Sequence, residues 1–354
     1  MSKFLNSAYK DLVPYVPGEQ PKDRAYVKLN TNESPFPPSP FALKLLREAA
    51  SDNNLYPDPE YTALLTVAAE KWGVKKENML FTNGSDEALS FAFSAYCGKG
   101  GTAVFADITY GFYEVFADFY GAKKKIIPLR ENFVLNADDY KNAGGTVFIA
   151  NPNAPTGLLL TLAEIESVLK SNPDNVVVID EAYIDFGGKS AVPLIKKYDN
   201  LIVVRTFSKS RSLAGIRLGV AIADEKLISD LKLIKYSTNP YNVSKASMYA
   251  GIGALIDEEY FTANCEKIIL NREKMKTALI GQGFSVTDSK ANFVFAKYNG
   301  ISGEKMYLAL KNKGVLVRYF DKKAIKDYVR ITVGSDEDTD ALLKATESVI
   351  KENL

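Results

Sequence analysis

The residues best suited to chemistry lie in residues 205–217, where one lysine stands among serines, a threonine and arginines. Lys209 follows a short apolar run, and the segment contains no acidic residue. Neighbouring cations lower the pKa of a lysine and favour its neutral, nucleophilic amine. Arg217 ends the segment with a guanidinium that can hold a phosphate through two hydrogen bonds. The segment therefore predicts a reactive lysine beside a bound anion.

A carboxylate follows another apolar run, residues 176–179. At the end of a strand, the charge of Asp180 is expected to be partly desolvated. An unpaired buried charge is costly, so this carboxylate needs a partner. A ligand, a helix cap or a local salt bridge could supply it, and the pattern leaves these alternatives open.

Two turns that follow apolar runs could bind the rest of a ligand. Residues 82–87 (Thr-Asn-Gly-Ser-Asp-Glu) precede a predicted helix, and the backbone N–H groups at a helix start suit a phosphate. An ordinary N-cap turn has the same composition. Residues 151–157 (Asn-Pro-Asn-Ala-Pro-Thr-Gly) form a rigid turn. Its asparagines could bind a hydroxyl group of the ligand, or the turn could have a structural role only.

The composition excludes several other chemistries. The 354 residues include no histidine, which rules out Ser-His-Asp triads, imidazole bases and His-ligated zinc, and we expect no metal site. Forty-four Lys and Arg against 43 Asp and Glu argue against a nucleic-acid partner. Cys97 and Cys265 form no CxxC pair, which favours a reducing compartment. No apolar run approaches the roughly 18 residues that span a bilayer. We therefore expect a cytoplasmic protein without a membrane partner.

Short apolar runs that alternate with amphipathic stretches must position these groups. The predicted strands are residues 79–81, 103–105, 126–129, 147–150, 176–179, 201–204 and 218–222, and the predicted helices among them include residues 87–96, 111–120 and 162–169. This alternation predicts an α/β fold whose mostly parallel sheet is covered by helices on both faces. Ligands of such sheets bind at the carboxyl ends of the strands. Thr161 and Glu164 predict a capping box, and residues 123–125, all lysine, are expected in a solvated turn.

The pattern changes in the last third of the chain. A long predicted helix at residues 257–279 leads to shorter strands and helices, which predict a smaller α+β domain. We expect an N-terminal arm with part of the small domain over residues 1–50, a large cofactor-binding domain over 51–250, and the small domain over 251–354. Two domains without a flexible linker suggest a cleft between them.

Together, the predicted groups are those that pyridoxal 5′-phosphate requires. Its aldehyde forms a Schiff base with a lysine, its pyridinium nitrogen needs a carboxylate, and its phosphate needs N–H groups and an arginine. We therefore predict this cofactor.

An ordered set of motifs resembles the fold-type I pyridoxal-phosphate enzymes of the class I/II aminotransferase group over nearly the whole chain. The motifs are residues 15–18, 29–35, 151–157 and 180–183, Ser208-Lys209 with Arg217, and residues 329–334. Within that group the set is most similar to the histidinol-phosphate aminotransferase branch. Aromatic aminotransferases and threonine-phosphate decarboxylases share much of it.

The resemblance implies a role for each matching residue. Lys209 would hold the cofactor and carry the proton, Asp180 would pair with the ring nitrogen, and Tyr183 would donate to the ring hydroxyl. Further cofactor contacts are implied for Ser85, Asp86, Tyr110, Asn153, Ser208, Arg217 and Tyr56, of which Tyr56 would reach the phosphate of the other subunit in a homodimer. Substrate binding is implied for Tyr15, Asn32, Arg318 and Arg330.

The chain departs from the family pattern at Ala154. Related enzymes commonly carry asparagine immediately before the Pro-Thr-Gly, where it bonds the ring hydroxyl. Asn153 could take that role from one position earlier, or Tyr183 could serve alone.

The reaction implied by the resemblance is transamination between L-histidinol phosphate and 2-oxoglutarate, which gives imidazole-acetol phosphate and glutamate. An aromatic-amino-acid aminotransferase and a decarboxylase of a phosphorylated amino acid are the alternatives within the class. A regulator that only senses ligand through the cofactor would carry an N-terminal DNA-binding domain; it is disfavoured because the aminotransferase-like pattern begins within the first few dozen residues and the chain is not basic. A non-enzymatic binding module is disfavoured because Lys209, Asp180 and Arg217 are all present.

Overall fold

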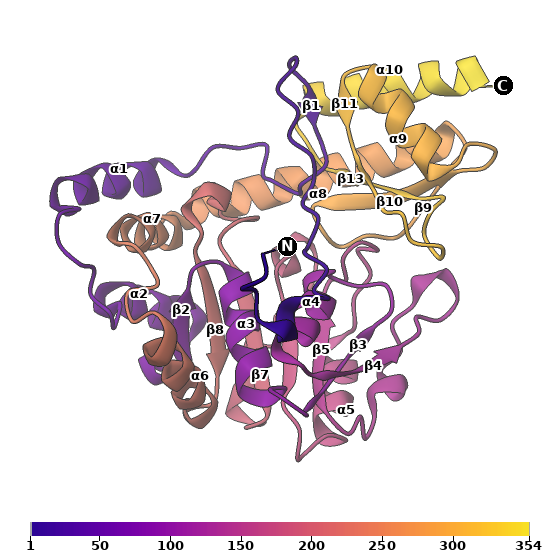
Figure 1. Ribbon diagram of the computed structural model, residues 1–354. Helices are drawn as coiled ribbons and strands as arrows, with labels where there is room; N and C mark the ends of the chain where they lie inside the picture. Colours follow the sequence, from indigo (N-terminus) through magenta and orange to yellow (C-terminus); the bar gives the residue numbers. More distant parts are fainter. Residues whose placement is uncertain (1, 354) are drawn as a thin grey trace.

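A large mixed sheet dominates the computed structural model, which describes residues 2–353 (Figure 1). Within these residues the sheet has seven strands in the order β2-β8-β7-β6-β5-β3-β4, and only β8 is antiparallel to its neighbours. The strands are β2 (Met79–Thr82), β3 (Thr102–Ala106), β4 (Lys123–Ile127), β5 (Thr146–Ala150), β6 (Val177–Asp180), β7 (Leu201–Thr206) and β8 (Gly219–Ala223). The predicted α/β class with a mostly parallel sheet is confirmed.

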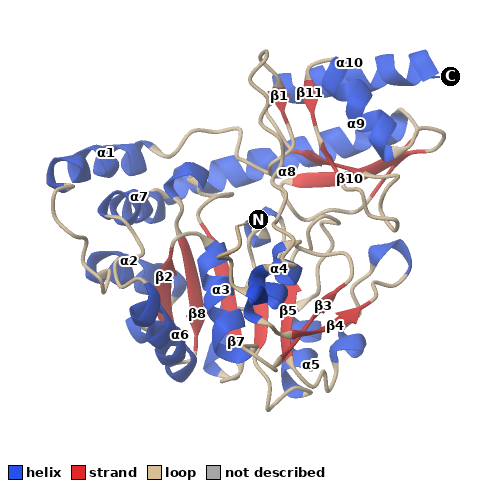
Figure 2. Ribbon diagram, viewed as in Figure 1, coloured by secondary structure: helices blue, strands red, loops and turns tan. Residues whose placement is uncertain are grey.

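Helices enclose this sheet (Figure 2). Strands β5, β6 and β8 are buried along their whole length, which requires cover on both faces and explains their unbroken apolar sequences. The helices are α1 (Pro40–Ala49), α2 (Thr62–Trp72), α3 (Ser85–Tyr96), α4 (Phe112–Tyr120), α5 (Leu162–Lys170), α6 (Glu225–Thr238), α7 (Lys245–Ile256), α8 (Glu258–Gly281), α9 (Gly303–Asn312) and α10 (Asp336–Asn353). The capping box predicted at the start of α5 is confirmed by both of its hydrogen bonds.

A smaller antiparallel sheet follows the long helix α8, which extends from beside α7 to this sheet (Figure 1). Its strand order is β12-β13-β10-β9. The strands are β9 (Phe284–Val286), β10 (Phe293–Tyr298), β12 (Arg318–Tyr319) and β13 (Val329–Thr332), and a separate parallel pair joins β1 (Val27–Lys28) to β11 (Val315–Leu316). Helices α9 and α10 pack on a second apolar core that includes Leu29 from the N-terminal arm.

The first fifty residues divide between the two cores. Strand β1 joins the C-terminal part of the chain, whereas α1 packs against α7 on the large core. The close approach of these helices depends on Gly253, where a Cβ atom would lie 2.6 Å from the Cα of Ala42. The structure therefore places residues 40–49 with the large sheet.

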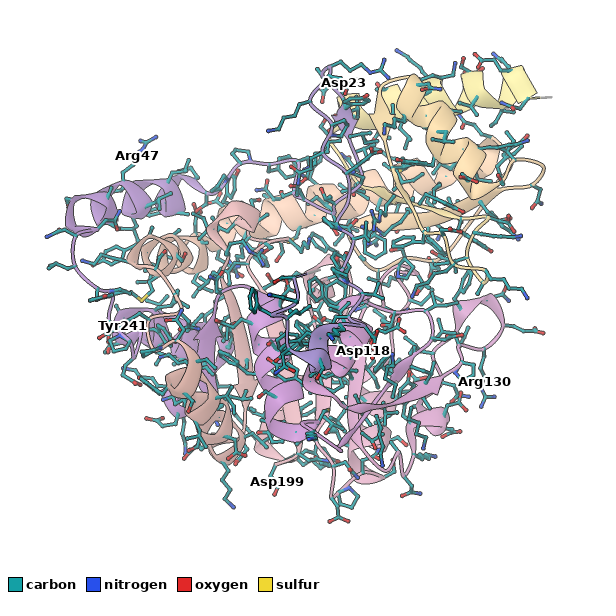
Figure 3. All side chains as sticks on the ribbon, viewed as in Figure 1. Asp23, Arg47, Asp118, Arg130, Asp199 and Tyr241 are labelled. Atoms are coloured by element: carbon teal, nitrogen blue, oxygen red, sulfur yellow. The ribbon has the colours of Figure 1, made fainter. Side chains whose placement is uncertain are left out.

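The three consecutive lysines of residues 123–125 begin β4, so the expectation of a turn was wrong. Strand β4 is the edge of the large sheet, and these three residues are exposed. Lysine on an edge strand prevents pairing with another chain, which accounts for charge within a strand. Elsewhere on the periphery, Arg47, Arg130 and Asp199 point outward (Figure 3). Within residues 2–353, no helix has the length and apolar character needed to cross a bilayer.

Candidate active site

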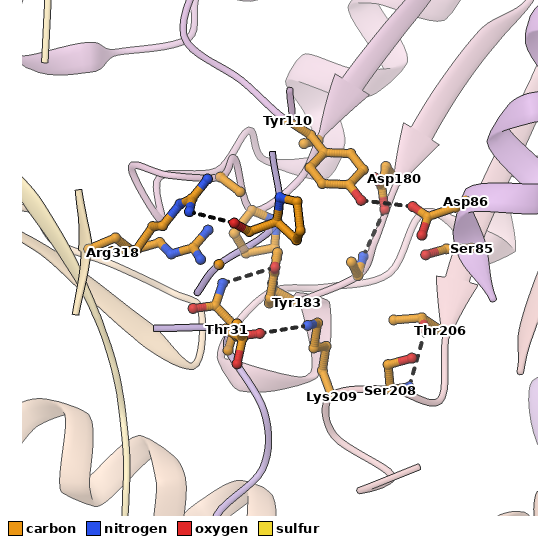
Figure 4. Close-up of a pocket in the computed structure, with 18 of the residues that line it drawn as sticks. Thr31, Ser85, Asp86, Tyr110, Asp180, Tyr183, Thr206, Ser208, Lys209 and Arg318 are labelled. Carbon is orange, nitrogen blue, oxygen red and sulfur yellow. Dashed lines mark hydrogen bonds between the residues drawn. The ribbon is translucent and has the colours of Figure 1, made fainter. Parts of the chain in front are cut away.

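A cavity of about 230 Å³ lies at the carboxyl ends of the large-sheet strands and reaches the small sheet (Figure 4). Five strands contribute through the loops that follow them, as expected for a sheet of this type. The predicted residues that line it are Tyr15, Asn32, Ser85, Asp86, Tyr110, Asp180, Tyr183, Ser208, Lys209, Arg217, Arg318 and Arg330. Residues far apart in the sequence thus meet in one place.

Lys209 extends into this cavity from the loop after β7. Its Nζ donates to the backbone carbonyl of Thr31 over 3.3 Å. Burial, followed by the positive charge of Arg330, lowers the pKa of Lys209 to about 8. The sequence pointed to neighbouring cations as the cause, whereas burial is the larger one. A lysine with this pKa can act as an amine base near neutral pH.

Asp180 is the last residue of β6 and is almost fully buried. Its Oδ2 accepts a hydrogen bond from the Tyr113 hydroxyl at 3.0 Å, and its Oδ1 accepts one from the Ala182 N–H at 3.1 Å. Burial raises the pKa of Asp180 to about 6, and these two hydrogen bonds oppose the rise. Within residues 2–353 no cation forms an ion pair with it. The carboxylate is therefore prepared to receive a positively charged ligand group.

A cradle of donors surrounds the start of α3. Gly84 precedes the helix with φ of +76°, and a Cβ there would lie 2.4 Å from Nη2 of Arg217. Arg217 makes only long contacts, 3.3 Å to the Ser208 Oγ and 3.4 Å to both the Asp86 Oδ2 and the Ala214 carbonyl. The first N–H groups of a helix have no partner within it and favour anions. This arrangement suits a phosphate group.

Aromatic side chains form one wall of the cavity. The Tyr110 hydroxyl donates to the Asp86 Oδ1 over 2.8 Å, which fixes its ring beside the cradle. Tyr15 comes from the N-terminal arm and stacks on Phe112, with ring centroids 4.4 Å apart. The Tyr183 ring centroid lies 5.8 Å from the Lys209 Nζ. A flat ring between these residues would meet aromatic surfaces.

Two arginines stand at the opposite end of the cavity. Arg318 and Arg330 are directly opposite each other on the antiparallel strands β12 and β13. Arg318 donates to the carbonyls of Val16 and Pro17, and Arg330 donates to the carbonyl of Asn30. Within residues 2–353 neither arginine forms an ion pair, and the buried Nε of Arg330 has no hydrogen-bond partner. Like charges directly opposite each other in a sheet repel and are unfavourable. A bound anion between the two arginines would relieve this repulsion.

Asn153 and Tyr56 are not brought to the cavity. Asn153 is buried, its Oδ1 accepts from Thr109, and its Nδ2 donates to the Ile108 carbonyl and to Thr156. Its amide therefore stabilises the turn itself, while Ala154 lines the cavity. The Tyr56 side chain is 80% exposed and stacks on Tyr241.

Sequence reasoning missed three contacts in this site. The Tyr113 hydroxyl holds Asp180, the Thr31 carbonyl holds Lys209, and the Thr332 hydroxyl holds Asn32. Only the contact of Tyr113 had a possible signal in the sequence, since this tyrosine lies in a predicted helix and a buried tyrosine hydroxyl needs a partner.

The residues present fit pyridoxal phosphate. Gly84 lets the Arg217 guanidinium lie against the backbone at the start of α3, since a Cβ there would stand 2.4 Å from its Nη2. Asp180 is a buried carboxylate without a cation, and Lys209 is a buried amine with a lowered pKa. These are the three attachments that the phosphate, ring nitrogen and aldehyde of that cofactor require.

Comparison with known proteins agrees with this geometry. Residues 24–345 match the family described as aminotransferase class I and II. The chain therefore belongs to the class I and II aminotransferases.

Its relatives define the branch within that family. The histidinol-phosphate aminotransferase of Brachyspira hyodysenteriae is 50% identical over 353 residues, which cover 99% of this chain and all of the relative. The crystal structure of the histidinol-phosphate aminotransferase from Clostridium acetobutylicum has a TM-score of 0.86 at 26% identity and covers 92% of this chain and 99% of that one. The enzyme from Sinorhizobium meliloti, solved in complex with pyridoxal 5′-phosphate, shares the fold with a TM-score of 0.89 at 23% identity and covers 99% of each chain. The chain belongs to the histidinol-phosphate aminotransferase branch.

Proposed function

We propose that the protein is a pyridoxal-phosphate-dependent transaminase that interconverts L-histidinol phosphate and 2-oxoglutarate with imidazole-acetol phosphate and glutamate. The observation that carries the proposal is the pair Arg318 and Arg330, two unpaired cations opposite each other in the cavity that holds Lys209. A dianionic phosphate on the substrate matches this charge, and the planar guanidinium suits both phosphate and carboxylate. The same pair can therefore receive either substrate.

The residues of the chain divide the work of the reaction. When bound, the cofactor supplies an electron sink for the charge left as a substrate C–H bond breaks. Lys209, as a neutral amine, takes that proton and returns it, which a pKa of about 8 permits at neutral pH. Asp180 holds a proton on the ring nitrogen through its buried carboxylate. Ser208, Arg217 and the N–H groups that begin α3 bind the cofactor phosphate.

The protein is further proposed to act as a homodimer in which Tyr56 reaches the other subunit's phosphate site. Its 80% exposed side chain supports this, because a tyrosine stacked on Tyr241 presents its ring outward. Tyr56 also borders a surface hollow that includes Arg217. A cytoplasmic location is proposed from the two free, buried cysteines, Cys97 and Cys265.

A panel of half-reactions tests the substrate. Each amino compound is added alone to the cofactor-loaded enzyme, and the loss of absorbance of the lysine-bound cofactor is followed. We expect glutamate and histidinol phosphate to react fast, and phenylalanine and threonine phosphate slowly. Fast reaction of phenylalanine with slow reaction of histidinol phosphate would show an aromatic aminotransferase instead, and release of CO₂ from threonine phosphate would show a decarboxylase.

A further inference from the structure

Asn32 connects the N-terminal arm to the tyrosine that faces the cofactor site. Its Nδ2 donates to the Tyr183 hydroxyl oxygen over 3.0 Å, and both residues line the cavity. Asn32 itself is 1% exposed and has φ of +54°, a left-handed conformation that asparagine tolerates better than most residues. The arm thus holds this amide in one fixed place.

The orientation of the amide is determined by its other contacts. The Thr332 hydroxyl accepts from the Asn32 backbone N–H at 3.0 Å, so its own proton is free to be donated to the Asn32 Oδ1 at 3.1 Å. The Asn292 side chain also donates to the backbone carbonyl of Asn32. Since the side-chain oxygen of Asn32 accepts the hydrogen bond from Thr332, the side-chain NH₂ group must face Tyr183.

This orientation decides what Tyr183 can do. A tyrosine hydroxyl has a single proton, and here the oxygen already accepts a hydrogen bond from Asn32. Within residues 2–353, Asn32 is the only hydrogen-bond partner of this hydroxyl. The Tyr183 proton is therefore uncommitted within the protein and can be donated into the cavity.

The loop on which related enzymes carry an asparagine offers no amide here. Ala154 stands at that position and lines the cavity, and the amide of Asn153 is used within the turn. We propose that Asn32 is a positioning residue that commits the Tyr183 proton to the cofactor's ring oxygen, so that an amide on the arm compensates for the missing amide on the loop. This inference depends on the proposed function only in requiring that the protein binds pyridoxal phosphate; it does not depend on the amino substrate.

The test is the pH titration of the absorbance of the bound cofactor, which follows the proton between the ring oxygen and the nitrogen bonded to Lys209. A donor to the ring oxygen stabilises its anion and makes that proton easier to lose. N32A should therefore raise the titration midpoint by about 0.5–1 pH unit, as expected for weakening one hydrogen bond to an anion. Y183F should raise it at least as far.

A double variant separates this role from a purely structural one. Because Asn32 acts through the tyrosine hydroxyl, N32A combined with Y183F should titrate like Y183F alone. N271A is the matched control, because Asn271 is an equally buried asparagine outside the cavity whose amide donates to the Gly334 carbonyl. N271A should leave the midpoint unchanged. Additive shifts of N32A and Y183F, or no shift in N32A, would overturn the proposal.

A second variant covers the case in which N32A does not fold. N32D keeps an acceptor for Thr332 but turns an acceptor instead of a donor toward Tyr183, so the tyrosine proton is drawn away from the cofactor. Its midpoint should rise, and a midpoint equal to that of the unmodified enzyme would contradict the proposal. These titrations need no amino substrate. Failure with histidinol phosphate would therefore count against the proposed function alone.

Discussion

The hydroxyl of Tyr113 donates to the Asp180 carboxylate at 3.0 Å, in the fully buried interior of the large core. The Tyr113 ring is held by Phe105 and Phe148, with ring centroids at 6.0 and 5.8 Å. The hydroxyl is therefore fixed, and it stabilises a carboxylate that burial makes costly. In a chain without histidine, tyrosine supplies this neutral donor.

Y113F should weaken cofactor binding about tenfold. The substitution keeps the ring packing and removes only the donor, so the pKa of Asp180 should rise above about 6, and a larger share of its carboxyl groups should be neutral at pH 7 and unable to pair with the ring nitrogen. The measurement is the cofactor dissociation constant of the apoenzyme. Y140F is the matched control, since Tyr140 is equally buried and its hydroxyl has no partner within residues 2–353. Equal affinities of Y113F and unmodified enzyme would show that the hydrogen bond does not support Asp180.

Lys209 should destabilise the apoenzyme at neutral pH. Its pKa is about 8 in the folded protein, against an ordinary value near 10.5. Between these values the unfolded chain binds more protons, so the stability contributed by this residue rises with pH from about 8 to 10.5, and the full penalty applies below 8. K209M should therefore stabilise the apoenzyme by about 1–3 kcal/mol at pH 7.

The pH dependence distinguishes charge from packing. The gain in K209M should shrink as the pH approaches 10, when measured by urea unfolding of the apoenzyme. K226M, at an exposed lysine of α6, should show no such trend. A gain in K209M that is the same at pH 7 and pH 10 would assign the effect to packing.

Gly84 should be required for the phosphate cradle. In G84A the new Cβ would lie 2.4 Å from the Arg217 guanidinium, and alanine would also occupy a left-handed backbone conformation. Gly73 has a similar φ of +62° but open space around it. G73A should therefore cost about 1 kcal/mol of stability and leave cofactor affinity unchanged. Gly84 has a ψ of 167°, in a region that is essentially restricted to glycine, so G84A should lose at least as much stability as G73A. It should also weaken cofactor binding by about 10–100-fold. Equal cofactor affinities of the two variants would show that the clash is relieved without loss of the cradle.

Most strands and their terminal polar residues could be predicted because the signal is local. An apolar run that ends at Asp180 or precedes Lys209 identifies a buried strand and a residue at its carboxyl end. The parallel sheet then brings those ends together. The family motifs added residues such as Arg318 and Arg330, whose positions depend on pairing between distant strands.

Features that depend on tertiary contacts could not be predicted. Helix α7 is apolar on all sides and contains Gly251 and Gly253, so it lacks the one-sided pattern that marks a surface helix. The contact between Asn32 and Thr332 joins segments 300 residues apart in the sequence. The amide of Asn153 could not be assigned either, because only the structure shows that Thr109 and Thr156 already bind it.

Arg330 should recognise the substrate phosphate, and its removal should act on selectivity more than on turnover. Its buried Nε has no partner within residues 2–353, and Arg318 faces it across the sheet, so an arriving phosphate gains hydrogen bonds from two otherwise unpaired cations. R330Q should raise the KM for histidinol phosphate by about 10–100-fold, as expected for losing a charged hydrogen bond. The KM for unphosphorylated histidinol should change much less, because that substrate never made the contact. R47Q, at an exposed arginine on the distant helix α1 (Figure 3), is the control and should alter neither value. If R330Q raised both KM values equally, the arginine would support the site without reading the phosphate.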